Sequence, residues 1–243
     1  MVNVSRSRIL SSALVGVLLT VSACSSSGEK FSFPITGPNN EIKGVLKIEQ
    51  GRCGEIGPVS GSWFRMFSEG ETVKENAPIT NHDSLCPNQT YSLLSPGKVG
   101  LRTGQFQEGP NPPFDAATNG LADDIIMPTR FYSVTFALSS EKTNPLTGAS
   151  LKAPQLMVST LIDKSGEVVL EAQLESLFVA WNGDLFEQGS PHPEGYVGQT
   201  DMAIGKINAK TGRFSLEWNS EVSSGPFKGF LGDWHLEGVF IPD

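Results

Sequence analysis

Three polar residues near the C-terminus have the types and the spacing of a catalytic or ligand-binding group. Asp233, His235 and Glu237 alternate with Trp234 and Leu236. In a β-strand, successive side chains point to opposite faces, so the three polar side chains share one face and the apolar ones share the other. A carboxylate–histidine–carboxylate row can bind a metal ion or transfer protons. A solvent-facing row opposite an aromatic core row explains the same pattern, and we favour this second interpretation.

A second candidate group lies between residues 181 and 193, where aromatic, amide, carboxylate and histidine side chains occur together. Its members include Trp181, Asp184, Glu187 and His192. An aromatic ring can stack on a sugar ring while neighbouring polar groups bond the sugar hydroxyls. The segment therefore indicates a weak binding site for a saccharide or another small molecule. A wide β-turn has the same composition and is the alternative.

No familiar catalytic motif accompanies these residues. The sequence has no nucleophile elbow, P-loop, zincin helix or EF-hand loop, and Ser60 lies near Gly57 and Gly61 without the G-x-S-x-G spacing. We therefore expect no metal ion and no cofactor, and we assign no catalytic residue. The function that we expect is binding of a small ligand or a protein partner, rather than enzymatic activity. The alternative is a cell-envelope hydrolase that uses carboxylates with His192 or His235.

Alternating apolar residues predict the strands that must position these groups. In residues 213–218, Phe214, Leu216 and Trp218 alternate with polar residues, which is typical of a half-buried antiparallel strand. A similar alternation occurs in residues 42–49. Further strands are predicted at residues 62–67, 131–138, 154–162, 168–174, 177–181, 201–207 and 233–241.

The residues between the predicted strands indicate hairpins. Residues 163–166 and 208–212 each place a glycine late in the loop, where a left-handed residue closes the turn. Residues 120–126 are the one candidate helix, ended by Pro128, and residues 95–119 are predicted to form a long irregular excursion. We therefore predict an all-β fold, a single antiparallel β-sandwich or β-barrel with long loops and one short helix.

The N-terminal residues have the three zones of a secretory signal. Arg6 and Arg8 precede an uncharged apolar run at residues 9–21, which is followed by the small residues Ser22 and Ala23. This run is too short to cross about 30 Å of hydrocarbon as a helix that rises about 1.5 Å per residue. We therefore interpret residues 1–23 as a signal peptide.

The end of this signal, Val21-Ser22-Ala23-Cys24, resembles the lipobox of bacterial lipoprotein precursors. In that motif an aliphatic residue and two small residues precede an invariant cysteine. The resemblance implies that Cys24 becomes the first mature residue and carries a diacylglycerol thioether and an acyl chain such as palmitate. Two or three chains make such an anchor stable, since one chain alone binds only marginally. Residues 24–30 would then be the lipidated cysteine and a tether.

The other two cysteines form a plausible pair once Cys24 is set aside. Cys53 and Cys86 are separated by 33 residues, a distance along the chain that argues against a zinc site. An exported domain lies in a compartment that permits disulfides, so we predict a bond between them. A crosslink over that separation stabilises a fold by about 3 to 4 kcal/mol in the chain-entropy model.

Charge and size restrict the possible partners. The signal holds two of the 18 basic residues and none of the 26 acidic ones, so the remaining chain has a formal charge of about −10. This charge argues against nucleic acid or an anionic membrane surface as a partner, because both need a cationic patch. We expect residues 31–243 to form one β domain, attached through Cys24 to the outer face of the cytoplasmic membrane or elsewhere in the cell envelope. Residues 225–240 also resemble C-terminal segments of secreted bacterial proteins, which implies a shared fold and no particular activity.

Overall fold

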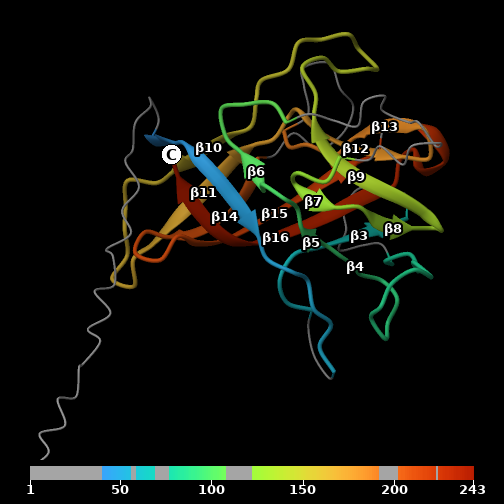
Figure 1. The fold of residues 1–243 in the computed structure, drawn as a ribbon, viewed down its shortest axis with the longest axis horizontal. Coiled ribbons are helices and arrows are strands. Elements are labelled where there is room, and N and C mark those ends of the chain that lie inside the picture. The colour runs from blue at the N-terminus through green and yellow to red at the C-terminus, as the bar shows by residue number, and fades with distance from the viewer. Residues whose placement is uncertain (1–39, 56–58, 69–76, 108–121, 192–201, 223) are drawn as a thin grey trace, which may run out of the picture.

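The computed structural model describes residues 40–55, 59–68, 77–107, 122–191, 202–222 and 224–243 (Figure 1). Almost all the regular structure in these ranges is β, and the helical part is the 3-10 turn η2 (Gly225–Phe227) together with Asn40. None of the described helices is long and apolar enough to cross a membrane. The prediction of an all-β antiparallel fold is confirmed.

The larger of the sheets has ten strands and curls strongly into a half-barrel. Its main path runs β1-β10-β11-β14-β15-β16-β2-β6, with β3 beside β16 and β4 beside β3. Every pairing in it is antiparallel. The strands are β1 (Glu41–Ile42), β2 (Gly44–Ile48), β3 (Trp63–Phe67), β4 (Ser92–Leu93), β6 (Leu101–Arg102), β10 (Gln155–Val158), β11 (Glu167–Gln173), β14 (Ala203–Asn208), β15 (Arg213–Glu221) and β16 (Leu231–Pro242).

A second sheet of four strands has the order β13-β12-β9-β8, and β5 pairs with β7 separately. One buried cluster joins side chains of both sheets, including Phe64 and Trp234 from the large sheet and Phe136 and Val179 from the small one. The core therefore lies between the two sheets. The remaining strands are β5 (Ser95–Pro96), β7 (Ile126–Met127), β8 (Thr129–Phe131), β9 (Val134–Ser140), β12 (Leu177–Trp181) and β13 (Asp184–Glu187).

The predicted alternation of buried and exposed side chains is confirmed in β15 and in residues 42–49. Phe214, Leu216 and Trp218 are buried, while Arg213 and Glu217 are exposed. The apolar residues at alternate positions of residues 42–49 are buried in the same core: Ile42, Leu46 and Ile48. This burial removes apolar surface from water, which is the main favourable term in folding.

The longest strand, β16, organises the large sheet. It pairs along one edge with β15, and along the other edge with β3 over its first part and β2 over its last part. Trp234, Leu236 and Phe240 from this strand are buried in the core. The side chains of Asp233, His235 and Glu237 alternate with these and therefore lie on the opposite face of the sheet. The neighbouring strands on that face are β15 and β3.

The predicted helix at residues 120–126 is wrong over its described part. Residues 122–125 are irregular, and Ile126 begins β7, which pairs with β5. Ile125 and Ile126 are both fully buried. Strand pairing and burial of these two side chains override the short local helical pattern.

The excursion predicted at residues 95–119 is also more ordered than expected over its described part. Residues 95–107 contain β5 and β6, and β6 pairs with β2. The side-chain amide of Gln107 donates to the carbonyl of Gly100 at 2.6 Å, and its carbonyl accepts from the amide of Arg102 at 2.8 Å. Residues 108–119 lie outside the described residues.

Left-handed backbone shapes several turns, including both predicted hairpin loops. Gly166 (φ 94°) and Gly212 (φ 70°) lie at the ends of the two predicted hairpin loops, which confirms both turns. The run predicted as one strand at residues 131–138 is instead a hairpin, because Tyr132 and Ser133 have φ values of 50° and 62°. Two consecutive left-handed residues form the tight turn that matches the twist of the strands β8 and β9.

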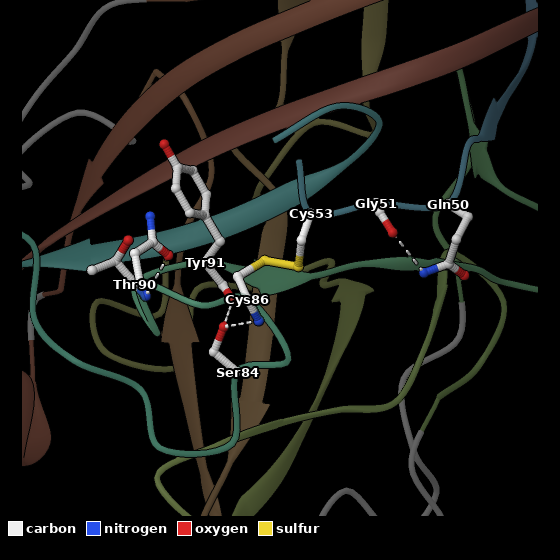
Figure 2. Close-up of a disulfide and its surroundings, with 8 residues drawn as sticks. Gln50, Gly51, Cys53, Ser84, Cys86, Thr90 and Tyr91 are labelled. Carbon is white, nitrogen blue, oxygen red and sulfur yellow. Dashed lines mark hydrogen bonds between the residues drawn. A yellow bond between two sulfur atoms is a disulfide. The ribbon is translucent and has the colours of Figure 1, made fainter. Parts of the chain in front are cut away.

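The disulfide between Cys53 and Cys86 is present, with a Cα–Cα distance of 5.3 Å (Figure 2). It joins the segment after β2 to the loop before β4. The Ser84 hydroxyl supports this loop, because it donates to the carbonyl of Tyr91 and accepts from the amide of Cys86. The predicted pairing is therefore confirmed. Cys24 lies outside the described residues.

Candidate functional site

His235 lies at the centre of a row of side chains that crosses three strands on the outer face of the large sheet. Its direct neighbours in register are Glu217 on β15 and Trp63 on β3. The His235 Nδ1 atom is 2.8 Å from the Glu217 carboxylate, and Nε2 is 2.9 Å from the Glu237 carboxylate. The Trp63 ring stacks on the imidazole at a centroid distance of 5.1 Å. Both ring nitrogens and one ring face are therefore occupied.

A second row lies beside the first and follows the same register. Asp233 is directly opposite Asn219 on β15 and Arg65 on β3. Its carboxylate accepts from the Arg65 guanidinium at 2.6 Å and from the Asn219 amide at 2.9 Å. Arg65 also donates to the Tyr91 hydroxyl and lies over the rings of Tyr91 and Trp63.

Sequence reasoning assigned the faces of β16 correctly but described the polar face incompletely. Asp233, His235 and Glu237 do share the face opposite Trp234. However, Asp233 is buried and the His235 side chain is only 12% exposed, because residues from β3 cover them. The residue types of the covering strand alternate in the sequence, but the sequence does not give the register that places Trp63 on His235.

The polar side chains on this outer face are already hydrogen bonded to one another. Among the described residues, no group of three or more His, Cys, Asp or Glu side chains is arranged to hold a metal ion. The Glu237 carboxylate also accepts from the amide of Gly61. The Ser62 hydroxyl donates to the main-chain carbonyl of Glu237 and accepts from its amide. A group of paired side chains of this kind stabilises the pairing of β3, β15 and β16.

The described residues of the second candidate group, at positions 181, 184 and 187, do not all lie together. Asp184 is exposed at the start of β13, and Glu187 is fully buried, where its carboxylate accepts from the Asn144 amide at 2.7 Å. Trp181 is half-buried and its indole N–H donates to the carbonyl of Phe131. His192 lies outside the described residues. The four residues therefore do not form a single site within the part of the chain that the structure describes.

Trp181 instead lines a cavity of about 40 Å³ between the two sheets. The lining is apolar except for Gln188. The side chains that line it come from β3, β8, β9, β12, β13, β16 and the segments beside them: Phe64, Met66, Phe131, Phe136, Val179, Trp181, Phe186, Gln188, Val222, Phe227 and Trp234. Sequence reasoning identified only Trp181 among these as a candidate binding residue.

The one polar side chain in the lining is already hydrogen bonded. The Gln188 side-chain carbonyl accepts from the Trp234 indole at 3.1 Å and from the Ser220 hydroxyl at 2.8 Å. Its amide group donates to the Glu187 carbonyl at 2.6 Å. The cavity wall therefore offers no free polar partner on this side chain, and an apolar occupant fits it better than a polar one.

Phe227 lies where four other aromatic rings meet at the cavity. It is on η2, in the connection between β15 and β16, and it is half-buried. Its ring contacts four others edge to face, at centroid distances of 5.4 to 5.7 Å: Trp181, Tyr132, Phe230 and Phe131. The one sequence signal for this cluster was the high number of phenylalanines, 14 in the chain. Their convergence depends on strand pairing far along the sequence.

The chain was compared with known proteins in three ways. A scan against protein-family models, a search of curated proteins and a search of solved structures each return no match.

Proposed function

We propose that this chain is a lipid-anchored protein of the cell envelope whose β domain binds the apolar part of a small ligand in the cavity between its sheets. The observation that carries the proposal is the aromatic lining of that cavity. Aromatic and aliphatic walls with few polar groups are typical of small-molecule sites. Two of the lining rings, those of Trp181 and Phe227, are half-buried, so the cavity lies close to the surface.

The size of the cavity limits what it accepts. Sites for complete drug-sized ligands measure about 300 to 1,000 Å³, whereas this cavity measures about 40 Å³. It therefore accepts a narrow group, such as the end of an alkyl chain, while the rest of the ligand stays outside. Movement of the Phe227 ring would enlarge it, because that ring forms part of the wall.

The proposed location rests on the sequence. The segment ending in Val21-Ser22-Ala23-Cys24 supports lipidation at Cys24. The disulfide between Cys53 and Cys86 supports an exported, oxidising compartment, since such bonds persist there and are rare in the cytosol.

The hydrolase alternative has less support from the geometry. A general base needs a nitrogen that can take a proton from a substrate or from water. Both nitrogens of His235 face carboxylates at hydrogen-bond distance, and Trp63 covers one face of the ring. The two carboxylates and the indole therefore make His235 part of a structural cluster rather than a free base.

Filling the cavity tests the binding proposal. Val179→Phe adds a ring to the lining, and Val169→Phe is the matched control because Val169 is exposed on β11. Straight-chain alcohols with a terminal bromine serve as probes, since bromine quenches tryptophan fluorescence on contact and Trp181 and Trp234 line the cavity. We expect saturable quenching in the wild type and in Val169→Phe, and its loss in Val179→Phe. Absence of saturable quenching in the wild type, or equal quenching in all three proteins, would contradict the proposal.

A further inference from the structure

The described chain begins beside an exposed hairpin tip. β1 pairs with β10 so that Glu41 faces Met157 and Ile42 faces Leu156. Because the strands are antiparallel, Glu41 lies at the end of β1 nearer the connection between β10 and β11. In Figure 1 the blue start of the described chain lies at the same end of the molecule as this yellow connection and the C-terminus.

This hairpin tip carries two adjacent aliphatic side chains in solvent. Leu161 is 83% exposed and Ile162 is 61% exposed. The tip does not use them for its own packing, because polar groups hold its shape. The Asp163 carboxylate accepts from the amides of Ser165 and Glu167, both at 2.9 Å, and the Ser159 hydroxyl donates to the Leu161 carbonyl at 3.0 Å.

A second hairpin supports the first and adds a cation. The amide of Ala209, in the turn between β14 and β15, donates to the Gly166 carbonyl at 2.9 Å. The Lys210 ammonium group lies 3.4 Å from the Ser165 carbonyl, and Lys164 is exposed on the tip itself. Aliphatic side chains beside lysines suit the interface of a bilayer, where lysine keeps its charge in the headgroup region.

We infer that Leu161 and Ile162 insert into the interface of the bilayer to which Cys24 is attached; this inference rests on the proposed lipid anchor. The chain from Cys24 to Asn40 covers 16 residue steps, which span at most about 58 Å when fully extended. A tether of this length allows this end of the domain to reach the lipid. The hairpin tip supplies a second, weaker contact that fixes the orientation of the domain.

The same contact places the cavity away from the lipid. β15 starts at Arg213, next to the turn that supports the tip, and ends at Glu221, next to the connection that carries Phe227. A strand of nine residues spans about 30 Å. The tip inserts at one end of β15, and the cavity opens near the other end.

The experiment uses the full lipidated chain reconstituted in phosphatidylcholine vesicles. An environment-sensitive dye is attached at Lys164→Cys, which leaves Leu161 and Ile162 in place, and in a separate protein at Asp184→Cys, which lies at the cavity end. Quenching is measured with brominated lipid and with iodide in the water. We expect several-fold stronger quenching by lipid at position 164 than at position 184, and the reverse order for iodide. Adding Leu161→Ser and Ile162→Ser should remove the difference at position 164.

Flotation of the same vesicles separates this inference from the anchor. If the protein does not float with the vesicles, the lipid anchor fails and the inference fails with it. If the protein floats but the dye at position 164 is quenched by iodide as strongly as the dye at position 184, the anchor stands and insertion of the tip is wrong. That outcome would leave Leu161 and Ile162 as a contact for another protein.

Discussion

The indole of Trp63 lies parallel to the imidazole of His235, with an interplanar angle of 5° and a centroid distance of 5.1 Å. The two residues are direct neighbours on β3 and β16. On the other face of the sheet, the preceding residue of β16, Trp234, stacks on Trp218 at 5.7 Å. Two aromatic stacks on opposite faces therefore hold adjacent residues of one strand, which makes this position a sensitive test of the fold.

We predict that Trp234→Ala lowers the free energy of unfolding far more than any substitution of His235. Trp234 is fully buried and its indole donates to Gln188. Truncating a buried tryptophan costs about 3 to 5 kcal/mol, because it leaves a cavity and unpaired polar groups. Urea denaturation monitored by circular dichroism measures the loss.

His235→Ala should cost about 1 kcal/mol, since its two carboxylate partners are partly exposed and can be hydrated in its absence. The Glu217 side chain is 68% exposed, so it needs little compensation. Glu217→Gln is the matched control and should cost less than His235→Ala. A loss for His235→Ala equal to that for Trp234→Ala would mean that the polar cluster, rather than the core, holds β16 in place.

Much of the fold follows from patterns that are local in the sequence. The alternation at residues 213–218 gave the inward face of β15, and the late glycines Gly166 and Gly212 gave two turns. These features depend on neighbouring residues, because side-chain period and backbone handedness are local properties. The pairing of Cys53 with Cys86 was identified from a count rather than from a local pattern, since setting Cys24 aside leaves two cysteines.

The site depends on pairing between distant segments, which the sequence does not specify. Phe64 and Phe227 are far apart in the chain and reach the same cavity through β3 and the connection after β15. The same limit explains the error at residues 120–126. Their short apolar run fits a helix locally, whereas in the described part residues 122–125 are irregular and Ile126 pairs with β5.

We predict that loss of the disulfide lowers stability without changing the fold. Cys53→Ser with Cys86→Ser should cost about 3 to 4 kcal/mol, because the crosslink closes a long loop in the unfolded chain. The melting temperature should fall by several degrees. Calorimetry of the oxidised protein and the double variant measures this difference, and mass spectrometry without reduction should show the linked peptide. Alkylation of both thiols in the native protein without reductant would contradict the bond.

We predict that Cys24→Ser abolishes lipid attachment. A hydroxyl in place of the thiol cannot form the thioether that the lipobox resemblance implies. Labelled palmitate should be incorporated into the wild type and not into the variant, which should persist as a precursor. Ser25→Ala is the control and should be labelled normally. Labelling of Cys24→Ser at the wild-type level would show that the anchor lies elsewhere.

We predict that Phe227→Ala widens the range of apolar ligands that the cavity accepts. The ring forms part of the wall and contacts Trp181, so removing it enlarges the space beside that indole. The cost in stability should be about 2 kcal/mol or more, since the ring makes four edge-to-face pairs that contribute about 0.5 to 1.5 kcal/mol each. Benzene and longer brominated alcohols should then quench tryptophan fluorescence at lower concentrations than in the wild type.

Two matched controls show whether the Phe227 ring is a plug, meaning a ring that blocks the cavity, or a residue that binds the ligand. Phe227→Leu keeps an apolar side chain over the cavity and should behave nearly as the wild type. Lys228→Ala changes an exposed neighbour on the same connection and should have no effect. If Phe227 is a plug, binding strengthens when it is removed. Weaker binding in Phe227→Ala, to the level of Val179→Phe, would instead make its ring part of the surface that holds the ligand.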